Sequence, residues 1–533
     1  NGGKGIDTIQ GDAGDDIIVW TVGDGMDAVI NGGSNTGADL FQLIGPASQS
    51  LDVQISASNS FLVVVGSETL TVSATESLRI EGGNQADTVT LNELAGSGLT
   101  QVSVDLGDDG VQDSVIVNGT ASADQYDINY SQVTLNLGDG HVTKAATVIN
   151  KVVSSSITAT IQVFGVGSAT DRVELNSLGG TDTVNVLGTQ SGVQTEVNTG
   201  DDADTVNVGD SSSLLNNING LLVVDGGSAT TGSDQLNLND SGDNQTNYGQ
   251  LTNNRITGLG MGSSSQTAIT ASRGVTYTGV EILTVNLGTG SDIFNVHSTS
   301  GAVDSTINTG TGTNANTVSV GSLSPATGGN VNSIAGKLTV VGQSTGIDTL
   351  VVDETGDSNL NVGALSANRL TGLGMAGGST SKGIEYSSID SLQINLGSGE
   401  DTFNVTATNA TTLTTVNTGA GTATNAVNVG SEILPTNGNL NGISGKLLVN
   451  GQSSGIDTLN IDDSGDSGSN TGTLSSNRLT GLGMAANDAS KGIEYSGISE
   501  LNIGLGSAVD ILTVASTHGT TTNIDGNAGG DIF

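Results

Sequence analysis

Short aliphatic segments that end in glycine recur throughout this 533-residue chain and constrain its fold more than any other feature. Segments such as "LTVNLG", "LQINLG" and "NAVNVG" place an apolar residue at every second position, which is the period of a β-strand with one buried face. The Gly that follows can take a positive φ without steric cost, so the chain can turn a corner and begin another strand. The sequence therefore predicts an all-β fold.

Internal duplication sets the size of the repeating element. "NRITGLGM" at Asn254 returns as "NRLTGLGM" at Asn368 and at Asn477, with starts 114 and 109 residues apart. Within this unit the glycines that end strand-like segments are 22, 32, 30 and 25 residues apart, and the next copy repeats these spacings: Gly288, Gly310, Gly342, Gly372, Gly397, then Gly419, Gly451, Gly481 and Gly506. We therefore predict a right-handed parallel β-solenoid (β-roll or β-helix) with coils of about 20–32 residues and no hairpins.

The repeats also suggest boundaries along the chain. We expect a Gly- and Asp-rich β-roll at 1–44, an irregular solenoid with a possible insertion at 45–160, regular solenoid at 161–287, long repeats at 288–396 and 397–505, and a partial repeat at 506–533. The segment from Tyr126 is the candidate for an inserted strand pair or a small side domain. Both ends of the chain lie inside repeat-like sequence, so we expect it to be a segment of a longer protein.

Charge restricts the partners of such a chain. Fifty-four Asp and Glu residues face 13 Lys and Arg, which gives a formal net charge of −41. This charge disfavours nucleic acid as a partner, and a compact body would need cations to neutralise part of it. There is no Cys, so disulfides and thiol chemistry are excluded. No apolar segment is long enough to predict a transmembrane helix.

The first residues follow the nonapeptide pattern G-G-x-G-x-D-x-U-x, where U is a large aliphatic residue. The first copy contains Gly2, Gly3, Gly5, Asp7 and Ile9, and the second contains Gly11, Asp12, Gly14, Asp16 and Ile18. Weaker copies contain Gly23, Gly25, Asp27 and Val29, then Gly32, Gly33, Gly37, Asp39 and Phe41, and finally Gly526, Gly529, Asp531 and Phe533.

These residues resemble the RTX family of calcium-binding repeats. The resemblance implies a parallel β-roll in which Gly carbonyls and Asp carboxylates of neighbouring turns hold Ca²⁺, a cation that takes six to eight oxygen ligands. It implies Asp7, Asp16, Asp27, Asp39 and Asp531 as carboxylate ligands, with Gly3, Gly5, Asp12, Gly14 and Gly25 as further candidates. It also implies export through a one-step secretion channel of a Gram-negative bacterium.

Half of this motif persists through the middle of the chain, as an Asp that begins a strand-like segment. The positions are Asp87, Asp113, Asp171, Asp182, Asp204, Asp234, Asp292, Asp348, Asp401, Asp457 and Asp510, with Asn316 and Asn425 in two further coils. Either these residues bind calcium or each caps its own turn in a stacked ladder. A second acidic cluster follows other strands, at Asp240 and Asp243, at Asp353, Glu354 and Asp357, and at Asp462, Asp463 and Asp466. Its members either wrap a calcium ion or form a solvated turn.

Catalytic patterns are not evident in the sequence. His141, His297 and His518 occupy unrelated places in the repeat, which indicates surface residues and offers no triad. Tyr277, Tyr386 and Tyr495 recur at one repeat position and indicate packing.

We therefore expect no enzyme, but a calcium-binding structural segment of a secreted bacterial surface protein, such as a surface layer, an extracellular filament or an adhesin stalk. Its expected partners are calcium, copies of itself or other surface components, and surface polysaccharide. The alternatives are a polysaccharide lyase or epimerase, and a carbohydrate-binding adhesin module, for which residues 45–160 are the expected place.

Overall fold

The protein is all-β. The computed structural model describes residues 3–25, 27, 29–33, 38–46, 49–57, 60–107, 109–136, 141–167, 170–228, 232–262, 273–376, 382–419, 421–432, 437–452, 455–488 and 490–533. Within these ranges there are 44 strands, and the one helical element is a single 3-10 turn, Met484–Asn487 (η1). No helix in these ranges has the length and apolar character needed to cross a membrane. The chain forms two compact units, residues 1–242 with 255–283 and residues 243–254 with 284–533.

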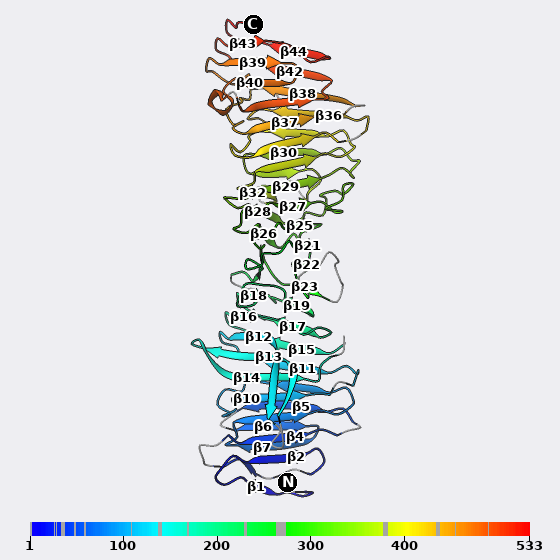
Figure 1. Ribbon diagram of the computed structural model, residues 1–533, viewed down its shortest axis with the longest axis vertical. Helices are drawn as coiled ribbons and strands as arrows, with labels where there is room; N and C mark the ends of the chain where they lie inside the picture. The colour runs from blue at the N-terminus through cyan, green and yellow to red at the C-terminus, as the bar shows by residue number, and fades with distance from the viewer. Residues whose placement is uncertain are drawn as a thin grey trace. The chain divides into compact units, whose positions relative to one another are not determined.

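Unit 1 is a stack of strands in two sheets, drawn from blue to green in Figure 1. Its sheet A contains β1 (Thr8–Gln10), β3 (Val29–Asn31), β5 (Asp52–Ala57), β6 (Phe61–Val65), β7 (Glu68–Ser73), β9 (Thr88–Leu91), β11 (Ser114–Asn118), β15 (Arg172–Asn176), β17 (Gln194–Asn198), β19 (Leu221–Asp225), β22 (Arg255–Gly258) and β23 (Gly274–Thr278). Its sheet B contains β2 (Ile17–Thr21), β4 (Leu40–Ile44), β8 (Ser77–Glu81), β10 (Gln101–Asp105), β12 (Gln125–Asn136), β13 (His141–Val153), β14 (Ser156–Phe164), β16 (Thr183–Val186), β18 (Thr205–Val208) and β20 (Gln235–Asn239).

Unit 2 has the same two-sheet construction. Its sheet A contains β21 (Tyr248–Thr252), β25 (Ile293–Val296), β27 (Asn316–Val320), β29 (Asp348–Asp353), β33 (Ser391–Asn395), β35 (Leu413–Asn417), β37 (Lys446–Asn450), β39 (Thr471–Ser475), β40 (Arg478–Gly481), β41 (Gly492–Ser496) and β43 (Ile511–Val514). Its sheet B contains β26 (Asp304–Asn308), β28 (Lys337–Val341), β30 (Val362–Ser366), β31 (Arg369–Gly372), β32 (Gly383–Ser387), β34 (Thr402–Val405), β36 (Thr424–Val429), β38 (Ile456–Asp462), β42 (Glu500–Gly504) and β44 (Thr521–Asp525). Strand β24 (Ile282–Asn286) crosses the boundary between the units along the chain.

Parallel pairing in exact repeat register builds each regular coil. In sheet B of unit 1, Val184 of β16 pairs with Val206 of β18, and Val206 pairs with Leu236 of β20. All three side chains are at most 2% exposed, so the alternating apolar residues form the core. The corners between the sheets are tight: Gly200 has φ +94°, and a Cβ there would lie 1.8 Å from the carbonyl oxygen of Leu178. The predicted parallel β-solenoid is confirmed.

Antiparallel excursions interrupt this regular path, and here the expectation of no hairpins is wrong. In unit 1 three consecutive strands, β12, β13 and β14, lie next to one another in sheet B, with β13 antiparallel to both of the others. The outer two then pair parallel with regular strands, β14 with β10 and β12 with β16. The triplets β5–β6–β7, β30–β31–β32 and β39–β40–β41 follow the same plan.

The excursions also correct the predicted count of coils. Gly372 and Gly481 end the returning strands β31 and β40, so they do not mark coils of their own. From Lys337 to its repeat equivalent Lys446 the chain changes sheet seven times, through β28, β29, the triplet β30–β32, β33, β34, β35, β36 and β37. One 109-residue repeat is therefore three and a half coils, and Lys337 lies on sheet B whereas Lys446 lies on sheet A.

The antiparallel register of β12 and β13 can be tested by cross-linking, because the chain contains no Cys. Thr134 and Thr143 face each other across the pair, and their hydroxyl oxygens are 3.1 Å apart. We expect Thr134→Cys with Thr143→Cys to form a disulfide under mild oxidation, measured by mass spectrometry and thiol titration. The control pair, Thr134→Cys with Val142→Cys, should cross-link poorly because neighbouring residues point to opposite faces of a strand. Equal cross-linking of the two pairs would contradict this register.

Candidate functional site

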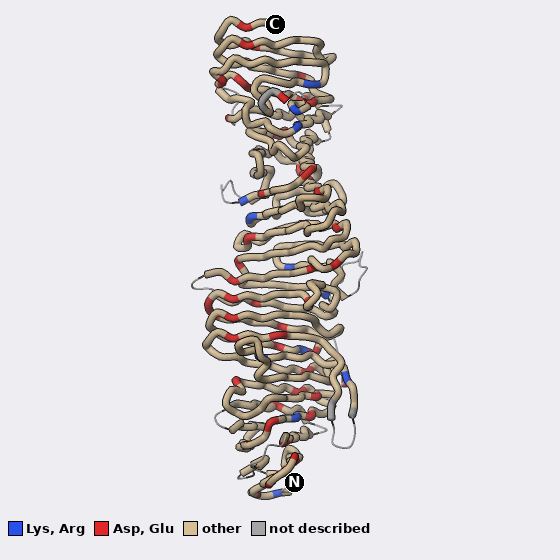
Figure 2. The backbone as a smooth tube through the Cα atoms, turned by 60° about the vertical axis from the view of Figure 1, so that its left-hand side comes forward, with Lys and Arg blue, Asp and Glu red and all other residues tan. Residues whose placement is uncertain are grey.

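The aspartates that begin the strands form ladders along the corners of the coils. Each backbone N–H donates to a carboxylate oxygen of the equivalent Asp in the next coil. In unit 1, Asp182 donates to Asp204 Oδ1 at 2.7 Å, and Asp204 donates to Asp234 Oδ1 at 2.8 Å. Figure 2 shows Asp and Glu recurring from coil to coil within each unit, with few Lys and Arg among them.

The same contact recurs at most of the strand-starting positions. The further pairs are Asp87 with Asp113, Asp113 with Asp171, Asp124 with Asp182, Asp292 with Asn316, Asp348 with Asp390, Asp401 with Asn425, and Asp510 with Asp531. At the ladder position of Asp457, the carboxylate accepts hydrogen bonds from Asn425 and Thr418. The structure thus shows a ladder of hydrogen bonds between coils, and some of these aspartates also cap their own turn, as Asp87 and Asp171 do by accepting the N–H of Gly83 and of Gly167. Calcium binding at these positions stays a prediction.

Asn can replace Asp in this ladder without loss of hydrogen bonding. Asn316 Oδ1 accepts the N–H of Asp292 at 2.8 Å, and its Nδ2 donates to the carbonyl of Thr309 at 3.0 Å and to Asp348 Oδ1 at 3.1 Å. Asn425 makes the same three contacts one repeat later. The ladder therefore needs an acceptor oxygen at each corner, but it does not need a negative charge there.

At many corners the charge is nonetheless present and poorly compensated. Oδ2 is buried without a hydrogen-bond donor at the corner residues Asp7, Asp16, Asp27, Asp113 and Asp234 of unit 1, and also at Asp463, which belongs to the second acidic cluster of unit 2. Desolvation by burial raises the pKa of Asp113 to about 7, of Asp234 to about 6 and of Asp463 to about 7. A buried carboxylate in this position favours either a proton or a cation.

The RTX-like start of the chain carries the first steps of two ladders. Asp7 donates its N–H to Asp27 Oδ1 at 3.2 Å, and Asp16 donates to Asp39 Oδ1 at 2.9 Å. The glycines allow close backbone approach between turns: a Cβ on Gly25 would lie 2.6 Å from the carbonyl oxygen of Gly5. In this arrangement the Asp of one turn accepts a hydrogen bond from the Asp of the turn before it, and calcium binding by these residues stays a prediction.

The other predicted residues of this region take different places. Asp12 is exposed with φ +42°, Gly3 and Gly14 have positive φ, and the carbonyl of Gly25 accepts a hydrogen bond from Trp20 Nε1 at 3.2 Å. Gly2 and Gly37 lie outside the described residues. Across the part of the chain that the structure describes, no three His, Cys, Asp or Glu side chains gather as a metal-binding group. A cation at these corners would therefore need backbone carbonyls or water among its ligands.

The second acidic cluster clamps long loops in unit 2. Asp353 Oδ2 accepts the N–H of Gly329 at 2.9 Å, and Glu354 Oε2 accepts the N–H of Val331 at 2.7 Å. One repeat later Asp462 and Asp463 make equivalent contacts with Gly438 and Leu440.

Asp357 and Asp466 complete these clamps. Asp357 accepts from Asn359 at 2.7 Å and from Asn332 at 2.9 Å, and these hydrogen bonds outweigh burial and lower its pKa to about 2. Asp466 accepts from Gly468 at 2.7 Å and from Asn470 at 3.1 Å. Because both oxygens of each carboxylate are engaged, a cation would have to displace existing donors here.

The recurrent tyrosines are core residues, and two of the histidines make polar contacts. Tyr277, Tyr386 and Tyr495 are at most 4% exposed, in agreement with the predicted packing role. His297 is half-buried between Gln250, at 3.0 Å, and the carbonyl of Ser324, at 2.7 Å, and is not the free surface residue that we expected. Half-buried His518 contacts Thr522 at 2.9 Å.

No protein-family model and no curated protein matches the chain. The RTX resemblance therefore depends on the quoted Gly and Asp residues, and the assignment of a function depends on the geometry described above.

The raised pKa values predict how stability varies with pH in the presence of a chelator. For Asp113, Asp182 and Asp234 the folded-state pKa of about 6 to 7 exceeds the unfolded value near 4, so the folded state binds more protons in this interval. The contribution of these three groups to stability should be fully present below about pH 4 and be lost as the pH rises from about 4 to 7, by on the order of 1 kcal/mol or more per group. Thermal unfolding followed by circular dichroism measures this, and a midpoint that rises with pH would contradict it.

Proposed function

We propose that this chain is a structural segment of a secreted bacterial surface protein, in which divalent cations, foremost Ca²⁺, neutralise the carboxylate ladders. The observation that carries the proposal is the coexistence of Asp and Asn at equivalent corners. Since Asn316 maintains the ladder without charge, the charge kept at corners such as Asp113 and Asp234, whose second carboxylate oxygen has no donor, costs desolvation energy without adding a hydrogen bond. Cation binding at these carboxylates would offset that desolvation energy.

The oxygen atoms at the corners are suitable ligands for calcium. Carboxylate oxygens without hydrogen-bond donors and nearby Gly carbonyls are hard ligands of the kind that Ca²⁺ takes. Asp7, Asp16, Asp27 and Asp39 would contribute carboxylates at the start of the chain, and Asp531 would do so at its far end. Bound calcium would screen the repulsion between coils of a chain with net charge −41.

The wider assignment follows from the same features. Calcium-dependent folding suits a chain that stays unfolded where calcium is scarce and folds outside the cell, where it would serve in a surface layer, a filament or an adhesin stalk. Copies of itself, other surface components and surface polysaccharide are its proposed partners.

An enzyme acting on polysaccharide is the less favoured alternative. Such an enzyme would need a set of Tyr, His, Lys or Arg placed once on one face, whereas the recurrent tyrosines of this chain are core residues. A carbohydrate-binding module is the other alternative. Its expected place, residues 45–160, provides most of the wall of a cavity, and that wall is mainly aliphatic.

Asp204→Asn tests the calcium proposal at a single ladder position. Asp204 is 1% exposed, burial raises its pKa, and the next two repeats have Asn316 and Asn425 at its place. In chelator at pH 7.5 the variant should be as stable as the parent or more stable, by about 1–3 °C, because an amide has no charge to desolvate. With millimolar calcium the parent should gain stability, and the variant should gain less.

The matched control is Asp353→Asn, which removes a charge from a carboxylate whose oxygens already have hydrogen-bond donors. It should lose stability in chelator and keep the calcium-induced gain. If calcium leaves the unfolding midpoint of the parent unchanged, the calcium proposal is wrong. If calcium stabilises parent and Asp204→Asn equally, the cations bind elsewhere.

A further inference from the structure

The β12–β13–β14 excursion opens a cavity in unit 1. In sheet A, β9 pairs directly with β11. In sheet B, β14 and β13 lie between β10 and β12, the strands that follow β9 and β11 along the chain. Neighbouring strands are about 4.8 Å apart. The connection from β9 to β10 and the connection from β11 to β12 therefore begin about 5 Å apart and must end about 14 Å apart. Their divergence leaves a cavity of about 490 Å³.

In unit 2, at the corresponding excursion β30–β31–β32, the Asp353–Asp357 clamp holds the connection between β27 and β28. In unit 1 the connection after β9 is the shorter segment 92–100, and it does not fill the space.

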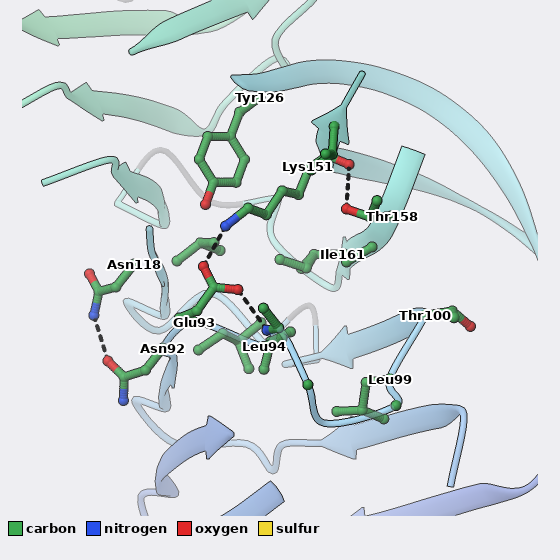
Figure 3. Close-up of a pocket in the computed structure, with 17 residues that line it drawn as sticks. Asn92, Glu93, Leu94, Leu99, Thr100, Asn118, Tyr126, Lys151, Thr158 and Ile161 are labelled. Carbon is green, nitrogen blue, oxygen red and sulfur yellow. Dashed lines mark hydrogen bonds and ion pairs between the residues drawn. The ribbon is translucent and has the colours of Figure 1, made fainter. Parts of the chain in front are cut away.

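Core-type side chains form most of the cavity wall (Figure 3). Leu91, Leu94 and Leu99 come from β9 and the connection that follows it, Val117 comes from β11, and Ile161 comes from β14. These residues lie where the next regular coil would otherwise cover them. A volume of this size is within the range of sites that bind small organic molecules.

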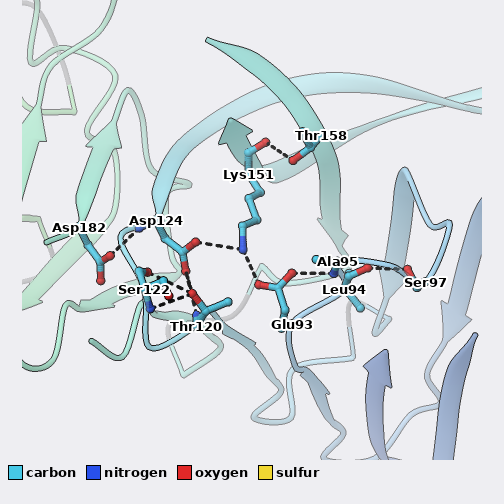
Figure 4. A network of polar contacts seen from close by, with 10 residues as sticks. All are labelled: Glu93, Leu94, Ala95, Ser97, Thr120, Ser122, Asp124, Lys151, Thr158 and Asp182. Carbon is cyan, nitrogen blue, oxygen red and sulfur yellow. Dashed lines mark hydrogen bonds and ion pairs between the residues drawn. The ribbon is translucent and has the colours of Figure 1, made fainter. Parts of the chain in front are cut away.

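One end of the cavity carries an ionic network (Figure 4). The Lys151 ammonium bridges Glu93 on one diverging connection and Asp124 on the other, with 3.1 Å between Lys151 Nζ and Asp124 Oδ1. It also lies 5.6 Å from the ring centroid of Tyr126. Hydrogen bonds to Glu93 and Asp124 outweigh burial and raise the pKa of Lys151, and burial raises the pKa of Tyr126. Lys151 is therefore cationic and Tyr126 neutral at pH 7.

The network keeps one negative charge in excess, because two carboxylates share a single ammonium. Glu93 is the accessible member: its side chain is 27% exposed, against 7% for Asp124, and it lines the cavity. Glu93 Oε1 accepts the N–H of Ala95 at 2.6 Å and, with two lone pairs, can accept a second donor.

We propose that this cavity binds a small apolar molecule that carries one cationic nitrogen, with its apolar body against Leu91, Leu94 and Leu99 and its nitrogen at Glu93. The net negative end of the cavity and the net charge of −41 disfavour an anionic ligand. A sugar is disfavoured because the described wall is mainly aliphatic.

Three probes of equal chain length test both parts of this proposal: heptylammonium, 1-heptanol and heptanoate, titrated calorimetrically at pH 7 in 150 mM salt. The ammonium should bind about two- to fivefold more tightly than the alcohol, the worth of one partly exposed ion pair, and heptanoate should bind most weakly. Glu93→Gln should abolish the preference for the ammonium while the affinity for the alcohol is kept. Glu68→Gln, which removes a charge outside the cavity, should leave the preference intact.

A filling variant tests the location. Ala159 lines the cavity, so Ala159→Trp should weaken binding of heptylammonium and heptanol at least tenfold. Ile157→Trp is the matched control, since Ile157 lies on the same strand, is 59% exposed and does not line the cavity. Circular dichroism confirms that both variants fold. Unchanged binding by Ala159→Trp, equal or tighter binding of heptanoate, or no binding of any probe at millimolar concentration would overturn the proposal.

Discussion

The regular coils depend on one hydrogen bond, in which a side-chain oxygen of the next coil accepts a backbone N–H. At a corner the chain leaves one sheet for the other, and the amide that begins a strand has no partner in its own coil. Asp204 and Asp234 supply that partner to the amides of Asp182 and Asp204 from the following coil, within hydrogen-bonding distance and out of contact with water. Because an unpaired buried amide is costly, this contact aligns each coil with the next and fixes the register of the apolar residues.

Two levels of the structure could be predicted from the sequence for clear physical reasons. Alternation over segments such as "TVNVG" can bury only one face of a strand, and the duplicated spacings require that neighbours stack in register. The position of Asp before each strand was also visible, although the two alternatives drawn from it, calcium binding and a cap on its own turn, did not include its role as acceptor for the neighbouring coil. The tyrosines at a constant repeat position were correctly assigned to the core.

Apart from the strand pair that was a candidate from Tyr126 onward, the excursions were not predicted, because a strand that turns back has the same alternation as one that continues. The segment "GALSANRLTG" reads as two strand-like segments, and only its pairing shows that β31 runs antiparallel to β30. A signal was nevertheless present, since the two-residue connection Ala367–Asn368 is too short for a change of sheet. The cavity beside Lys151 could not be predicted for a further reason. It lies between two diverging connections, one carrying Glu93 and the other Asp124, which are far apart in the sequence.

The half-integral length of the long repeat has a consequence for how unit 2 presents its surface. Lys337 pairs with Glu385 at 3.0 Å on sheet B, and its equivalent Lys446 pairs with Glu494 at 2.9 Å on sheet A. Two successive copies of one sequence thus display the same ion pair on opposite faces. Because the repeat contains an odd number of half-coils, successive copies place the same residues on opposite faces of the unit. A partner that recognises one repeat therefore finds a second, outward-facing copy on the opposite face of the same unit. A repeat of whole coils would instead have aligned all copies along a single face.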